Sequence, residues 1–263
     1  MIYLGDCLTK DTPIFLTSGK EPMFKLCHKK SEKLYIKDFN PAEFVGEELC
    51  ILKKIRCPHY FMVGVGARNY RSYFPYQSAK KMCCGLGIAS KSFHRPGYKY
   101  KSVTDYGLSQ YDEDIFEKML EQANGEENRK QLCEEMLQLL ALDIYMGQTD
   151  RFAFNYEFEE DKEHHVHLAP IFDFQYSLSP LFIKEDAICY GDLQPFQDFE
   201  ECREFLKKYP KFGEYLKSYL GEDLASIVKS SYAKRRMIVP EKEISVCREF
   251  EKSQKEKIKR IVR

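Results

Sequence analysis

The sequence has no excess of charge of either sign. Its 263 residues include 41 Lys and Arg and 41 Asp and Glu, so the formal net charge at pH 7 is 41 − 41 = 0. Proteins that coat nucleic acid or an anionic membrane usually carry a clear basic excess. The balance excludes a globally basic binder, and we expect neither a nucleic-acid partner nor a membrane partner.

The sequence also lacks a secretion signal, a membrane-length apolar run and any Cys-x-x-Cys pair. Asp6 lies where the apolar core of a signal would be, and the longest apolar stretch, 136–146, is interrupted by Gln138 and Asp143. That stretch is shorter than the roughly 20 residues of a membrane span. The ten cysteines are scattered, which is typical of reduced thiols. We therefore expect a cytoplasmic protein with no disulfide or zinc framework.

The apolar pattern changes near residue 78, and this change indicates two lobes. Before it, short apolar runs predict strands, and the pair Asn40-Pro41 predicts the start of a helix. The predicted strands are Ile14–Leu16, Met23–Cys27, Leu34–Lys37, Phe61–Gly66 and Tyr70–Tyr76. After it, helical spacing predicts helices over 112–123, 126–147, 198–209, 213–232 and 241–262, with one hairpin, 156–158 and 166–172. The fold class is α+β, with a strand-rich lobe over 1–77, a hinge near 76–81 and a helical lobe over 78–263.

Three oxygen-bearing side chains follow the longest predicted helix. Asp150 and Asn155 lie on the loop that leaves it, and the hairpin returns the chain so that Asp173 can lie beside Asn155. Phosphoryl transfer needs metal-bridged phosphates and one carboxylate near the attacking hydroxyl, and Mg²⁺ prefers hard oxygen ligands. The alternative is that these residues are simple caps and strand ends. Their conjunction predicts a phosphoryl-transfer site.

The same segments resemble a known family. Gly147-Gln-Thr-Asp-Arg-Phe-Ala-Phe-Asn155 and Leu168-Ala-Pro-Ile-Phe-Asp173 look like the catalytic and metal-binding segments of HipA-like kinases. These are bacterial serine/threonine kinases with a protein-kinase-like fold, known from toxin–antitoxin modules. The resemblance implies ATP and Mg²⁺ as cofactors, Asp150 as catalytic base, and Asn155 and Asp173 as Mg²⁺ ligands. The family usually has His where this chain has Phe152.

The strand-rich half is expected to hold the ATP phosphates. Leu34-Tyr-Ile-Lys37 resembles the third-strand lysine motif of kinases, in which the lysine contacts phosphates and pairs with a helix glutamate. We expect Glu47 as that partner, with Glu48 as second choice. Upstream, Ser18 and Gly19 lie on a turn whose N–H groups could face phosphate. A solvated strand-end lysine and an ordinary hairpin turn are the alternatives.

Three other patterns invite a functional interpretation that we do not adopt. Gly85–Ser92 is one residue from a P-loop, but no apolar strand precedes it, so we predict a loop or helix after the hinge. His164, His165 and His167 lie on a polar turn and are expected to be surface residues rather than a metal site. Residues 252–263, with a local charge of +5 (six basic side chains and one acidic), predict a packed helix with a solvated basic face.

These observations predict an ATP- and Mg²⁺-dependent HipA-like kinase that phosphorylates Ser or Thr. The acceptor would be a protein that the sequence does not identify, or the chain itself. A phosphoinositide-type lipid kinase, whose loop also reads Asp-Arg-x-x-x-Asn, is one alternative. A pseudokinase is another, because Phe152 and Gln175 depart from kinase patterns. The resemblance also raises an antitoxin-like partner, but toxin members carry an additional amino-terminal subdomain, so a toxin role does not follow.

Overall fold

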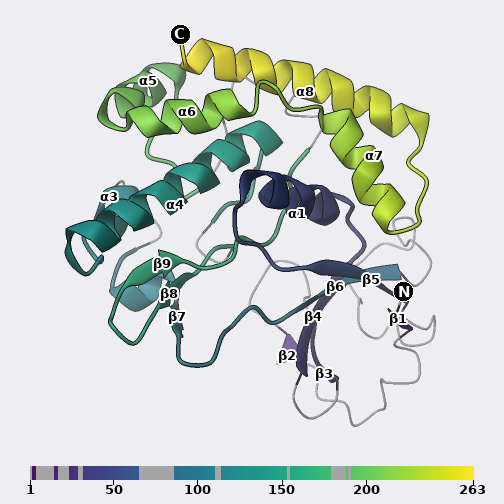
Figure 1. The fold of residues 1–263 in the computed structure, drawn as a ribbon, viewed down its shortest axis with the longest axis horizontal. Helices are drawn as coiled ribbons and strands as arrows, with labels where there is room; N and C mark the ends of the chain where they lie inside the picture. The colour runs from purple at the N-terminus through teal and green to yellow at the C-terminus, as the bar shows by residue number, and fades with distance from the viewer. Residues whose placement is uncertain are drawn as a thin grey trace.

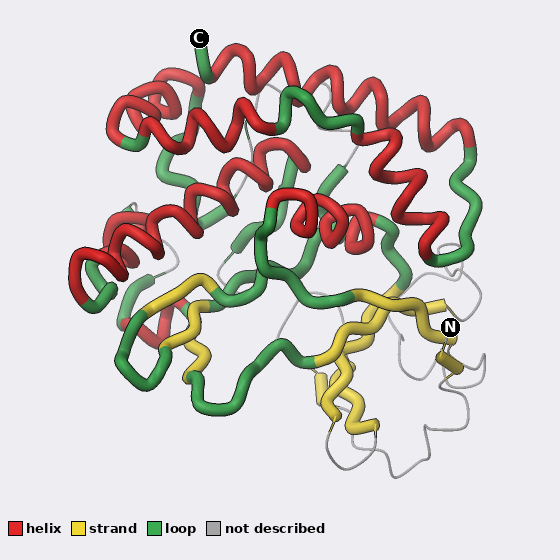
Figure 2. The backbone as a smooth tube through the Cα atoms, viewed as in Figure 1, coloured by secondary structure: helices red, strands yellow, loops and turns green. Residues whose placement is uncertain are grey.

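The computed structural model describes residues 2–3, 15–16, 24–28, 32–64, 86–109, 114–152, 155–178, 188 and 191–263. Strands gather at one end of the molecule and helices at the other, as the yellow and red segments of Figure 2 show. Helix α1 (Ala42–Lys53) lies between them (Figure 1). No helix within the described ranges is long and apolar enough to span a membrane.

The first part of the chain forms a six-stranded sheet. Its strands are β1 (Ile2–Tyr3), β2 (Phe15–Leu16), β3 (Phe24–His28), β4 (Glu32–Asp38), β5 (Tyr60–Gly64) and β6 (Leu86–Lys91), in the order β1-β5-β6-β4-β3-β2. The strands predicted from 14 to 37 and at 61–66 fall on β2 to β5. The strand predicted over 70–76 lies outside the described residues. Strand β4, which carries Lys37, is central, and Lys37 pairs with Ile88 of β6.

Strand β6 corrects one prediction and extends the sheet. It pairs antiparallel with both β4 and β5, so the Gly85–Ser92 segment is neither a P-loop nor the expected loop or helix. Pairing on both sides outweighs the weak strand propensity of its glycine and its lysine. The sheet therefore continues beyond residue 77, where the lobe boundary was predicted. The predicted hinge at 76–81 lies outside the described residues.

Helix α1 begins where the sequence predicts it. The Asn40 side-chain oxygen accepts a hydrogen bond from the Ala42 N–H at 3.0 Å, which satisfies one of the unpaired donors of the first turn. The helix ends at Lys53, and the residue after it, Lys54, has a left-handed φ of 57°. It packs against strand β5 and helix α7 (Leu224–Lys234), so it contacts both parts of the molecule.

The second part is mainly helical. Its other elements are η1 (Val103–Tyr106), α3 (Ile115–Leu120), α4 (Gly125–Met146), α5 (Phe199–Lys208), α6 (Pro210–Ser218) and α8 (Glu241–Ile261). The predicted apolar stripe of α4 is buried, as the sequence indicates. The single helix predicted over 213–232 is wrong. The chain breaks after Ser218, and Asp223 caps α7 by accepting a hydrogen bond from the Ser226 N–H at 3.1 Å.

The predicted hairpin belongs to a second, three-stranded sheet of β7 (Lys99–Lys101), β8 (Phe158–Glu160) and β9 (Val166–Leu168). Side chains of α4 cover its β9 edge. The Asn128 side chain accepts from the Val166 N–H at 2.9 Å and donates to the Val166 carbonyl at 2.8 Å. Glu135 accepts from the Leu168 N–H at 2.7 Å. The hairpin is therefore fixed to α4, and the chain that leaves it returns to the end of that helix.

Candidate active site

The candidate active site includes the loop that carries Asp150 and Asn155. This loop begins at Gly147, the residue that caps the end of α4. Gly147 has a φ of 57°, and a Cβ there would lie 2.9 Å from Cζ of Phe250 on α8. Both the left-handed conformation and the close approach of the ring require glycine. The direction in which the chain leaves α4 is thus set by the turn and by the packing of α8.

The side chain of Gln148 joins the two halves of the site. It is fully buried. Its oxygen accepts from the N–H groups of Thr149 at 3.0 Å and Asp150 at 3.3 Å, and its nitrogen donates to the Asp173 carbonyl at 2.9 Å. The backbones of Asp150 and Asp173 are therefore fixed by one amide. Sequence analysis missed this residue because glutamine is most often exposed.

Asp150 and Asn155 face each other within the loop. The Asn155 nitrogen donates to the Asp150 carboxylate at 3.0 Å and also bonds the Asp150 carbonyl. The Asn155 amide oxygen is the atom of that side chain able to bind a cation, because its nitrogen can only donate. The spacing of five residues thus brings a carboxylate and an amide together.

Arg151 connects this loop to the segment before Asp173. Its guanidinium forms a bidentate pair with Asp143 of α4, with two N···O distances of 3.0 Å. Its remaining nitrogen donates to the carbonyls of Asn155 at 2.7 Å and Phe172 at 2.6 Å. Burial raises the pKa of Asp143, and the guanidinium opposes that rise. A buried pair in which each guanidinium nitrogen is hydrogen-bonded fixes its partners in place, so Asn155 stays close to Asp173.

Asp173 has an uncommon backbone conformation. Its φ is 63°, a region that L-residues other than asparagine and aspartate seldom occupy. Its N–H donates to the Tyr60 hydroxyl at 3.4 Å. Burial raises the pKa of Tyr60 strongly, and the nearby Glu43 and Asp173 raise it further. Such backbone conformations persist only where the surroundings hold them, and they concentrate at functional sites.

Helix α1 contacts the residues after Asp173 directly. The Glu43 carboxylate, fully buried, accepts from the Phe174 N–H at 3.1 Å. The Asn40 side chain donates to the Gln175 carbonyl at 2.7 Å. A Cβ on Gly46 would lie 2.4 Å from Cγ of Phe174, so the ring lies against the backbone of the helix. The first turns of α1 therefore form one wall of the site.

No protein-family model and no curated protein matches this sequence. Solved structures do match over almost the whole chain. The proinflammatory kinase CtkA of Helicobacter pylori is 14% identical, with a TM-score of 0.61 and coverage of 99% of this chain and 96% of CtkA. The chain has a protein-kinase-like fold.

Two further matches agree with that fold. One is the toxin–antitoxin complex of HipA, HipB and operator DNA from Shewanella oneidensis MR-1, with 11% identity, a TM-score of 0.57 and coverage of 94% and 65%. The other is the Golgi casein kinase, with 10% identity, a TM-score of 0.51 and coverage of 95% and 73%. The predicted α+β, protein-kinase-like fold is confirmed.

The site residues predicted in the first part of the chain lie in different places, and two of them are not described. Lys37 lies on the central strand β4. Ser18 and Gly19 lie outside the described residues. Glu47 and Glu48 lie on α1, one helical turn or more after Glu43. Glu47 accepts from the Tyr60 N–H at 3.2 Å and is paired with His59, and both glutamates are paired with the end of α7.

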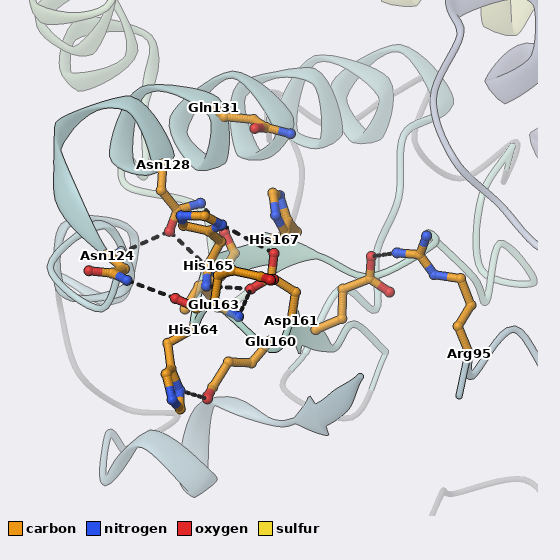
Figure 3. Close-up of polar contacts among 12 residues, drawn as sticks. Arg95, Asn124, Asn128, Gln131, Glu160, Asp161, Glu163, His164, His165 and His167 are labelled. Carbon is orange, nitrogen blue, oxygen red and sulfur yellow. Dashed lines mark hydrogen bonds and ion pairs between the residues drawn. The ribbon is translucent and has the colours of Figure 1, made fainter. Parts of the chain in front are cut away.

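The three histidines each have a carboxylate partner, as Figure 3 shows for two of them. The pairs are His164 with Glu160 at 2.6 Å, His165 with Asp161 at 3.1 Å and His167 with Glu135 at 3.5 Å. The described part of the chain holds no group of three or more His, Cys, Asp or Glu placed to bind a metal. A nucleotide-bound Mg²⁺ needs only one or two protein carboxylates, so this finding does not bear on Asp173.

Proposed function

We propose that this chain is an ATP- and Mg²⁺-dependent protein kinase of the HipA-like type that phosphorylates Ser or Thr hydroxyls. The observation that carries the proposal is the gathering of Asp150, Asn155 and Asp173 at the end of α4, against the wall formed by α1. A kinase-like fold with these groups at this place has the parts that phosphoryl transfer requires. A cytoplasmic location and an antitoxin-like partner, predicted from the sequence, belong to the same proposal.

Asp150 is the group that would accept the proton of the attacking hydroxyl. Asp173 and the amide oxygen of Asn155 would hold Mg²⁺, because both are hard oxygen donors and two protein groups suffice for this ion. The ion would bridge the phosphates and offset the charge of the transferring group. Gln148 and Arg151 keep these three residues in one arrangement through the hydrogen bonds described above.

Glu43 is our candidate for the partner of Lys37, in place of Glu47 and Glu48. Its carboxylate lies beside Phe174, next to the proposed metal ligand Asp173. Glu47 and Glu48 are paired instead with α7. Lys37 would contact the ATP phosphates, and Ser18 and Gly19 would cover them. The lobes would meet after Lys91, where the Phe93 ring stacks on Phe172 at 5.4 Å.

The structure also supports an active enzyme over a pseudokinase. Gln175 replaces the glycine of Asp-Phe-Gly, but it is not among the described residues with a positive φ. Its backbone therefore needs no glycine. Phe152, in place of the family histidine, is 39% exposed and leaves the Asp150–Asn155 contact intact.

Transfer of radiolabelled γ-phosphate tests the proposal. With Mg²⁺, we expect labelling of the chain itself or of an added protein mixture. Asp150→Asn and Asp173→Asn should each lower the rate about 10² to 10⁴-fold, because a positioned base or metal ligand is removed. Asp161→Asn, a matched change on the hairpin turn, should leave the rate unchanged.

The molecule that receives the phosphate distinguishes a protein kinase from a lipid kinase and from a pseudokinase. Equal activity in wild type and both site variants would overturn the proposal. Label transferred only to phosphatidylinositol vesicles would favour a lipid kinase. Nucleotide binding with no transfer to protein or lipid would favour a pseudokinase.

A further inference from the structure

Charged side chains join the second turn of α1 to the end of α7. The Arg235 guanidinium lies 2.5 Å from the Glu47 carboxylate and 3.5 Å from that of Glu48. Lys234 pairs with Glu48 as well. The residues involved are separated by almost two hundred positions in the sequence, yet α1 and α7 pack side by side.

Most of these charges are withdrawn from water. The side chains of Glu47, Glu48 and Arg235 are 4%, 9% and 10% exposed. The guanidinium also lies 4.0 Å above the ring of Phe44, which belongs to α1. A guanidinium fork holds two carboxylates in a defined geometry, which a flexible lysine does not. Removing one partner from a buried pair leaves an uncompensated charge, so α1 cannot leave α7 without a large cost.

The turn of α1 held by α7 is next to the turn that lines the site. Glu43 precedes Glu47 by one helical turn, and Glu43 accepts from the Phe174 N–H. A shift or rotation of α1 would move both contacts, because a helix moves as a rigid element. The position of Glu43 beside Asp173 is therefore coupled to Arg235 on a distant helix.

We propose that Arg235 is a positioning residue for phosphoryl transfer, assisted by Lys234. It acts through α1 and keeps Glu43 against the Phe174 N–H, beside Asp173. The inference rests on the proposed function for its catalytic consequence. It gives the helical part a further role: this part holds α1 in the arrangement that the reaction needs, without an added partner.

Variants of Arg235 and Lys234 test this role. Arg235→Gln should lower kcat about 10 to 100-fold with little change in the KM for acceptor, since misplacement of about 1 Å can cost 10²-fold. Arg235→Lys, which keeps the charge but not the fork, should be intermediate. Lys234→Glu should lower kcat less, because the Lys234 side chain is 56% exposed. Lys207→Glu, in an exposed pair on α5, is the control and should have no effect.

Hydrogen exchange of the Phe174 amide gives a readout that needs no activity. In Arg235→Gln it should exchange about tenfold faster while the core amides of α4 are unchanged, because only the local contact with Glu43 is lost. If Arg235→Gln does not fold, the double variant Arg235→Gln with Glu47→Gln, which removes both charges of the Arg235–Glu47 pair, is used in its place.

Two results would overturn the inference: an unchanged Phe174 exchange rate in a folded Arg235 variant, or a kcat of Arg235→Gln equal to that of the wild type. If the wild type transfers no phosphate, the proposed function fails, whereas the Phe174 exchange still decides whether Arg235 positions Glu43.

Discussion

At Gly46, the absence of a side chain lets α1 lie against the ring of Phe174. This contact and the bond from the Phe174 N–H to Glu43 lie within one turn of the helix, so the ring and the carboxylate are placed together. Glycine is a poor helix former, less favourable than alanine by about 1 kcal/mol. A glycine inside α1 is therefore explained by the closeness of Phe174 and not by helix stability.

The substitution Gly46→Ala should lower both stability and phosphate transfer. Its methyl group would overlap the Phe174 ring, and such overpacking costs about 1 to 3 kcal/mol, more than the gain in helix propensity. Urea unfolding and the rate of γ-phosphate transfer measure the two effects. Gly221→Ala is the matched control, because nothing lies within 4 Å of its added Cβ. A Gly46→Ala variant as active as wild type would contradict this account of the contact.

Some residues of the site could be predicted from sequence and others could not. Asp150, Asn155 and Asp173 lie close in sequence to one helix and one hairpin, so local pattern was enough to bring them together. Our proposal of Glu43 in place of Glu47 could not be made from the sequence. Both lie on one helix, and what distinguishes them includes Arg235, which is 188 residues from Glu47. Sequence patterns show that a helix carries glutamates, but not which one each neighbour meets.

At the level of elements, α4 organises the second sheet. An uncovered edge strand presents unpaired backbone groups to any other strand. Here Asn128 bonds both backbone groups of Val166, and Glu135 bonds the next one that faces the helix. Asn124 extends the contact by donating to the Glu163 carbonyl (Figure 3). The hairpin that precedes Asp173 is thus hydrogen-bonded along one edge to the helix that precedes Asp150.

Replacement of Asn128 should therefore destabilise the chain more than its small side chain suggests. Asn128→Leu leaves buried backbone groups of Val166 without partners, which costs about 1 to 3 kcal/mol for each such group. We expect a loss of about 2 to 4 kcal/mol in urea unfolding. Gln131→Leu, on the exposed side of the same helix (Figure 3), should change stability by less than about 0.5 kcal/mol. Equal effects in the two variants would refute the role given to Asn128.

Elements with strong periodicity were predicted well, and those decided by distant pairing were not. The α4 stripe and the cap at Asn40 depend on neighbours in sequence. Strand β6 forms because β4 and β5 supply partners on both sides, a condition that residues 86–91 do not encode. The break between α6 and α7 ends at Asp223, which caps α7 although it lies inside an apolar pattern. Its signal was present and was outweighed by the surrounding periodicity.

At the level of the whole molecule, the proposed site draws on both parts of the chain. Lys37 and Glu43 belong to the sheet and its helix, whereas Asp150, Asn155 and Asp173 belong to the helical part. A nucleotide bound by both sets would connect the two parts. Its binding energy would then stabilise the molecule as a unit, since a ligand that binds only the folded state shifts unfolding by mass action.

ATP with Mg²⁺ should therefore raise the unfolding temperature. At 100 times its dissociation constant, a ligand contributes about 2.7 kcal/mol, which corresponds to about 5 to 10 °C for a chain of this size. Differential scanning fluorimetry measures the shift. Asp173→Asn should lose most of the Mg²⁺-dependent part, and Asp161→Asn should keep it. An equal shift in excess EDTA would contradict the proposed metal ligand.

The packing of Phe250 on Gly147 has a consequence for synthesis. The turn that begins the Gly147–Asn155 loop is completed by a ring that lies 103 positions later in the sequence. Ribosomes add about 5 to 20 residues per second, so the loop waits about 5 to 20 s for that ring to be made. During this interval Asp150 is already present in the nascent chain but its supporting contacts are incomplete. The loop that carries Asp150 therefore reaches its final arrangement only after α8 has been made.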